Sequence, residues 1–144
     1  MSQDPITSLK QQVQKEPYSE LIGTTLVELA PGRAVVEMRL RPELANLFSR
    51  LHGGAVFSLI DEAFELSSNS HGTIAVALSM AITYHNAPRL EGTLRAESKE
   101  IHRSRKTSSY EIKVWDQNRL LIASCQALAY RKEEALPFLQ EPPP

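Results

Sequence analysis

Residues 46–72, NLFSRLHGGAVFSLIDEAFELSSNSHG, decide the fold of this 144-residue chain. Apolar side chains recur in the middle of this stretch with the spacing i, i+3, i+4, i+7 and i+8: Val56, Leu59, Ile60, Ala63 and Phe64. That spacing places them on one face of an α-helix. The helix is predicted from Gly54 to about Ser70, where His71-Gly72 closes it.

The segments on both sides of this helix read as β-strands, with clear alternation over residues 33–40 and 107–116 and a long, mostly apolar run over 73–85. Before it, residues 24–30 and 33–40 are predicted to form a hairpin around the turn Pro31-Gly32. After it, strands are predicted at 73–85, 93–102, 107–116 and 119–131. An antiparallel sheet must cover its apolar face, and one helix does so when the sheet curls around it. The sequence therefore predicts an α+β fold, a curved antiparallel sheet of about six strands wrapped around one long central helix.

The length suits a single domain over residues 1–144 and leaves no room for a second. The core of this domain is expected at about 18–131. A short amphipathic helix over about 6–16, ended by Pro17, is predicted before it. A flexible tail is expected from about 133 to 144.

Composition excludes several classes of function. The formal net charge is −1, which argues against the basic face that nucleic acid requires. The single cysteine, Cys125, excludes an intramolecular disulfide and fits a reducing compartment. The N-terminal segment lacks the apolar core of a signal peptide, and no apolar run approaches the ~20 residues that span a bilayer. We therefore expect a cytoplasmic protein that binds neither nucleic acid nor membrane.

The motif His52-Gly53-Gly54 stands where a loop becomes the central helix. Paired glycines let another group approach the backbone closely. A helix N-terminus presents unpaired N–H groups and a partial positive charge, which suit the stabilisation of an oxyanion. The alternative is that the two glycines only permit a tight bend.

Asp61 lies within the helix, on the same face as Gly54 and beside the apolar stripe. Partial desolvation there would raise the pKa of its carboxyl and make it a better base. Alternatively, Asp61 is a solvated carboxylate on the helix surface, a position for which Glu62 and Glu65 are better candidates.

Distance constrains how the glycines and Asp61 work together. Seven residues of helix span about 10 Å, whereas an oxyanion donor and a base must each lie ~3 Å from their target atoms. If both groups act on one carbon, Gly53 and Asp61 come from different subunits whose helices run antiparallel. This geometry predicts a C2 dimer with two equivalent sites.

The frame Asn46…His52-Gly53-Gly54…Asp61 resembles the hotdog-fold acyl-CoA thioesterases of the phenylacetate-degradation type. The resemblance covers about residues 18–131. It implies that Asp61 activates the attacking water or attacks directly, and that the Gly53 N–H polarises the thioester carbonyl with help from Gly54. It further implies that Asn46 positions the nucleophile across the interface and that His52 orients the thioester or the leaving thiolate.

One position departs from the family pattern. Some relatives hold the water with a Ser or Thr on the strand after the helix. Here the matching position is Ala77, and Ser79 lies two residues further, on the expected same face of the strand. Ser79 is therefore the substitute candidate for that role.

Further residues are weaker candidates for contact with the substrate. Arg103, Arg105 and Lys106 could meet the phosphates of CoA, or form a solvated turn. Phe57 could line an acyl pocket, or belong to the core. The histidines and the single cysteine show no metal-ligand spacing, so no metal is expected, and no other cofactor.

These features favour hydrolysis of acyl-CoA thioesters by a homodimer, with pairing of dimers into a homotetramer expected from the resemblance. Three alternatives stay open. The chain could be a non-catalytic acyl-CoA-binding module, a hotdog hydratase or dehydratase, or a purely structural oligomerisation domain.

Overall fold

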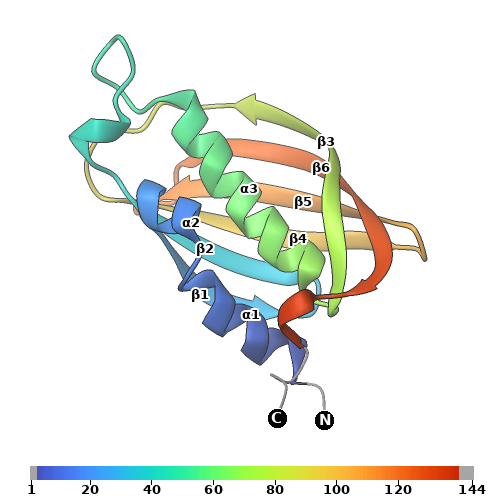
Figure 1. Ribbon diagram of the computed structural model, residues 1–144. Coiled ribbons are helices and arrows are strands. Elements are labelled where there is room, and N and C mark those ends of the chain that lie inside the picture. Colours follow the sequence, from blue (N-terminus) through green and yellow to red (C-terminus); the bar gives the residue numbers. More distant parts are fainter. Residues whose placement is uncertain (1–2, 140–144) are drawn as a thin grey trace.

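A six-stranded antiparallel sheet forms the framework of the computed structural model, which describes residues 3–139 (Figure 1). Its strand order is β1-β2-β4-β5-β6-β3. The strands are β1 (Thr24–Ala30), β2 (Arg33–Arg39), β3 (Thr73–Tyr84), β4 (Thr93–Arg103), β5 (Thr107–Asp116) and β6 (Leu121–Ala135). The hairpin and the four later strands were all predicted from the sequence. The structure thus confirms the α+β fold with its sheet wrapped around a helix.

The long helix α3 (Gly53–Asn69) crosses the concave face of this sheet (Figure 1). The apolar stripe that predicted it is buried, with Leu59, Ile60 and Ala63 fully inaccessible to solvent. Phe64 meets the ring of Tyr110 on β5 edge to face, with the ring centroids 5.4 Å apart. Burial of this stripe against the sheet holds α3, and both of its ends, in place.

The N-terminal segment differs from the prediction. Instead of one helix over 6–16, it forms α1 (Pro5–Val13) and a second helix, α2 (Pro17–Ile22). Asp4 caps α1 by accepting a hydrogen bond from the Thr7 N–H at 3.1 Å. Pro17 does not merely end a helix: it is the first residue of α2, where its fixed φ is favourable.

The C-terminal end also differs from the prediction. β6 continues to Ala135, and the 3-10 helix η2 (Pro137–Leu139) follows it. Leu136 and Leu139 are buried, 4% and 9% exposed. The expected flexible tail is therefore wrong for residues 133–139, and its last part, 140–144, lies outside the described residues.

The strand β3 forms one edge of the sheet and exposes apolar side chains. Val76 is 41% exposed and Leu78 is 55% exposed. Along 3–139, no helix is both long and apolar enough to cross a membrane. The edge strand and the outer face of α3 frame the region that holds the candidate site (Figure 1).

Candidate active site

The residue before α3, His52, caps the helix. Its Nδ1 accepts a hydrogen bond from the Gly54 N–H at 2.8 Å. Its carbonyl oxygen accepts from the Ala55 N–H at 3.0 Å. The N–H of Gly53, the first helical residue, has no acceptor among residues 3–139. Of the two glycines that were expected to hold an oxyanion, Gly53 therefore keeps its donor available, whereas Gly54 gives its donor to the cap.

The two glycines also differ in the space around them. A Cβ added at Gly54 would lie 3.0 Å from the Nδ1 of His52, so a side chain there would crowd the capping imidazole. A Cβ added at Gly53 would meet the Tyr84 ring at 3.5 Å, an ordinary contact. Tyr84, at the end of β3, donates a hydrogen bond from its hydroxyl to the Gly53 carbonyl at 3.1 Å. Sequence reasoning missed Tyr84, because nothing in the order of the strands tells which residue ends beside the helix.

Asn46 organises the loop before the helix. Its side-chain oxygen accepts hydrogen bonds from the Phe48 N–H at 2.8 Å and the Arg50 N–H at 3.1 Å. Ser49 sits at a φ of 58°, in the left-handed region. Leu47 and Phe48 extend from this turn with 96% and 81% of their surface exposed. Asn46 therefore shapes an exposed apolar loop in the protomer, and its role across an interface stays a prediction.

Asp61 lies on the outer face of α3 together with Gly54, Phe57 and Glu65, all of them exposed in the single chain. The surrounding protein still raises the pKa of the Asp61 carboxyl, first by partial desolvation and then by the charge of Glu16. The expected direction of the pKa shift is thus present. Phe57 is 40% exposed, so it does not belong to the protomer core.

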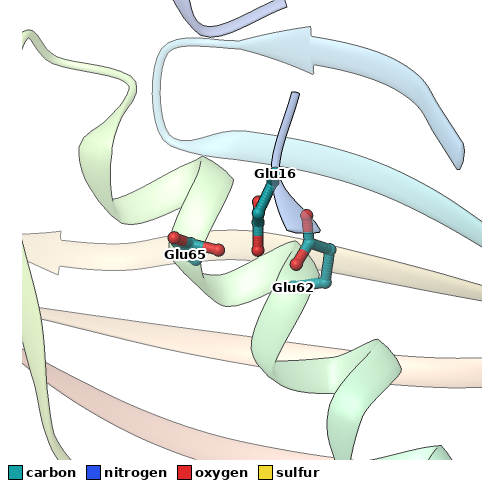
Figure 2. Close-up of side chains that lie close together, drawn as sticks. All are labelled: Glu16, Glu62 and Glu65. Carbon is teal, nitrogen blue, oxygen red and sulfur yellow. The ribbon is translucent and has the colours of Figure 1, made fainter. Parts of the chain in front are cut away.

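The expectation for Glu62 is wrong, while that for Glu65 is right. Glu65 is exposed, but Glu62 is only 3% exposed. Glu16, at the junction of α1 and α2, brings its carboxyl to the same part of α3 (Figure 2). Sequence reasoning missed Glu16.

The expectation that Ala77 and Ser79 share a face of β3 is wrong. Ala77 pairs with Ala129 and Ser79 pairs with Leu128, so Leu78 is an extra residue that forms a β-bulge. Successive residues of β6 point to opposite faces, and a bulge therefore reverses the side-chain direction along β3. Met80, rather than Ser79, pairs with the buried Ala127, so Ser79 turns away from α3.

The basic residues at the β4–β5 turn are mostly paired. Arg105 contacts Glu133 at 2.5 Å, and Arg103 lies 3.7 Å from Glu100. Lys106 is exposed and has no ion-pair partner in the described part of the chain. This turn lies at the end of the sheet opposite to the N-terminus of α3 (Figure 1). Within one protomer, the structure does not bring these residues to Gly53.

Comparison with known proteins identifies the family. The model of the thioesterase superfamily matches residues 48–123. The chain belongs to this superfamily. An Archaeoglobus fulgidus protein, whose name describes it provisionally as an esterase, is 40% identical over 118 residues, covering 82% of this chain and 77% of that protein. The acyl-coenzyme A thioesterase PaaI of Escherichia coli is 28% identical over 118 residues, covering 82% and 84%.

The crystal structure of E. coli PaaI, a protein from the phenylacetic acid degradation operon, superimposes with a TM-score of 0.88. It is 25% identical, and the match covers 93% of this chain and 97% of that one. The predicted resemblance is thereby confirmed: the chain is a hotdog-fold thioesterase of the PaaI type. The matched region includes the His52-Gly53-Gly54 motif and Asp61, the residues that carried the prediction.

Proposed function

We propose that this thioesterase hydrolyses acyl-CoA thioesters at a site built from the N-terminus of α3 and Asp61. One observation carries the proposal: the free Gly53 N–H and the Asp61 carboxyl, with its raised pKa, both belong to α3, where Gly53 is half-buried and Asp61 is exposed. The relatives named above as thioesterase and esterase support the choice of reaction.

The site needs two chains. Eight residues of α-helix separate Gly53 from Asp61 by about 12 Å, too far for both to act on one carbonyl carbon. The outer face of α3 carries Phe57, and the neighbouring edge strand carries the exposed Val76 and Leu78. Burial of this apolar face against a second copy would set two α3 helices antiparallel. Gly53 of one chain would then approach Asp61 of the other, twice in each dimer.

The reaction follows from the groups available. Asp61 takes a proton from water as the water oxygen adds to the thioester carbonyl carbon. The carbonyl electron pair moves to its oxygen, where the Gly53 N–H and the positive end of the helix stabilise the charge. Collapse of the tetrahedral intermediate breaks the C–S bond and expels the CoA thiolate, which a proton then converts to the thiol. The products are a carboxylic acid and CoA, and no redox cofactor is needed.

The free-thiol release from a panel of acyl-CoAs, from short aliphatic to phenylacetyl, tests this proposal. Wild type should release CoA, and Asp61→Asn should lose at least ~100-fold in turnover, because a positioned base typically contributes that much. Glu20→Gln is the matched control, since Glu20 is exposed on α2 and should change nothing. Tight CoA-ester binding without turnover would favour a binding module instead. Full activity of Asp61→Asn would remove Asp61 from the mechanism.

A further inference from the structure

Three carboxylates from separate parts of the chain meet beside α3. Glu62 and Glu65 belong to α3, and Glu16 comes from the junction of α1 and α2 (Figure 2). One carboxylate oxygen from each residue lies within 4.8 Å of those of the other two. Like charges at this distance repel, so a folded chain that holds them together requires a compensating positive charge or shared protons.

Glu62 is the member of this cluster that most needs a partner. The residue is 3% exposed, and its Oε1 is buried without a hydrogen-bond partner. Its carboxyl turns toward that of Glu16 (Figure 2). Across residues 3–139, no Lys, Arg or His lies within 4.0 Å of any of the three carboxylates. A buried, unpartnered carboxylate is unfavourable, and such groups are normally paired or coordinate a metal.

Glu16 does not cap the helix that it precedes. It stands at the N-cap of α2, where a side-chain oxygen can accept a hydrogen bond from the N–H of the second or third helical residue. Its side chain makes no such capping hydrogen bond and instead reaches toward α3 (Figure 2). The carboxylate therefore lies beside two others of the same sign rather than at the cap of α2.

Solvent has access to the cluster. Glu65 is exposed, and Glu16 and Glu65 both line a cavity of about 480 Å³ between α1, the C-terminal half of α3 and the segment around η2. An ion that enters by this route can keep water molecules as its remaining ligands.

We propose that Glu16, Glu62 and Glu65 bind a hard divalent cation of the size of Ca²⁺ or Mn²⁺. All three ligands are carboxylate oxygens, which such ions prefer over softer metals. Two oxygens that bind one Ca²⁺ at 2.3–2.6 Å can be up to about 5 Å apart, so a spread within 4.8 Å fits. Mg²⁺, at 2.0–2.1 Å, would require the oxygens to draw closer. The cation would fasten the α1–α2 junction to α3, a role separate from thioester hydrolysis.

Calorimetric titration of the EDTA-treated protein with CaCl₂ and with MnCl₂ tests the site, together with thermal unfolding at pH 7.5. Wild type should bind one cation per chain, and its melting temperature should rise with the cation concentration. Glu62→Gln, which keeps the shape of the side chain, should weaken binding at least ~10-fold and abolish the rise in melting temperature. Glu16→Gln removes a ligand from a less buried position and should act in the same way. Glu20→Gln should behave as wild type.

Two results would overturn the proposal. If neither cation produces binding heat or a thermal shift in wild type at 1 mM, the cluster is held together by shared protons. If Glu62→Gln and Glu16→Gln both fold and retain wild-type affinity, the bound cation lies elsewhere on the chain. Circular dichroism establishes the folding of both variants, and thiol release from acyl-CoA is measured separately, so that loss of the cation site and loss of hydrolysis remain distinguishable.

Discussion

The Nδ1 of His52 accepts a hydrogen bond from the Gly54 N–H at 2.8 Å, directly at the start of α3. This contact gives the two adjacent glycines different roles. The Gly54 N–H satisfies the helix cap, while the Gly53 N–H stays available to a substrate oxygen. Because Nδ1 accepts in this contact, Nε2 is the ring nitrogen of His52 that is left for a thioester substrate.

Gly53→Pro should remove the oxyanion donor without unfolding the helix. Proline lacks the N–H, and it is favoured at the first position of a helix. The ψ of 135° at His52 suits a following proline. We expect kcat for acyl-CoA hydrolysis to fall by about 10²–10³-fold with a near-wild-type melting temperature. Gly53→Ala, which keeps the N–H, is the control. Equal activity of the proline and alanine variants would exclude the Gly53 N–H from catalysis.

His52→Ala should reduce stability as well as activity, because it removes the cap. The expected loss is about 1 kcal/mol in the free energy of unfolding, measured by urea denaturation. His52→Ser should restore the stability, since serine is a strong N-cap, but should not restore activity if the imidazole orients the substrate. Recovery of full activity in His52→Ser would show that the histidine serves only as a cap.

The elements predicted best from the sequence are those with a long regular period. The stripe of α3 repeats with the period of a helix and β2 alternates with the period of a strand, and that period indicates the type of element. The second helix α2 has no such signature, because it is six residues long and its Pro17 also fits the end of the preceding helix. Short elements depend on packing that the local pattern does not encode.

Two features of the site region depend on relations between distant residues. The bulge at Leu78 adds one residue to β3, and this reverses Ser79 although the apolar pattern around it is unbroken. Glu62 is buried, and the carboxyl beside it belongs to Glu16, 46 positions earlier in the chain. By contrast, His52, Gly53 and Asp61 were predictable because they belong to one helix and its cap.

Cys125 should be chemically inert in the folded protein. It is 2% exposed, and burial raises the pKa of its thiol to about 11. A thiol-specific disulfide reagent at pH 8 should therefore label it only after unfolding. Because the folded thiol holds its proton to higher pH than the unfolded one, the free energy of unfolding should fall as pH rises from 9 to 11. The free energy of unfolding of Cys125→Ala should fall less over this range. An equal fall in the variant and in wild type would assign the effect to other groups.

Mixing two inactive variants tests whether each site is shared between chains. If Gly53 of one chain works with Asp61 of the other, a dimer of Gly53→Pro with Asp61→Asn has one site with both changes and one site with neither. Random reassortment of equal amounts, by unfolding and refolding together, gives one half mixed dimers, so activity should recover to about a quarter of wild type. If both groups acted within one chain, each site of the mixed dimer would still carry one change, and no activity would return. Wild type refolded in the same way sets the reference, and the two variants refolded singly should stay inactive.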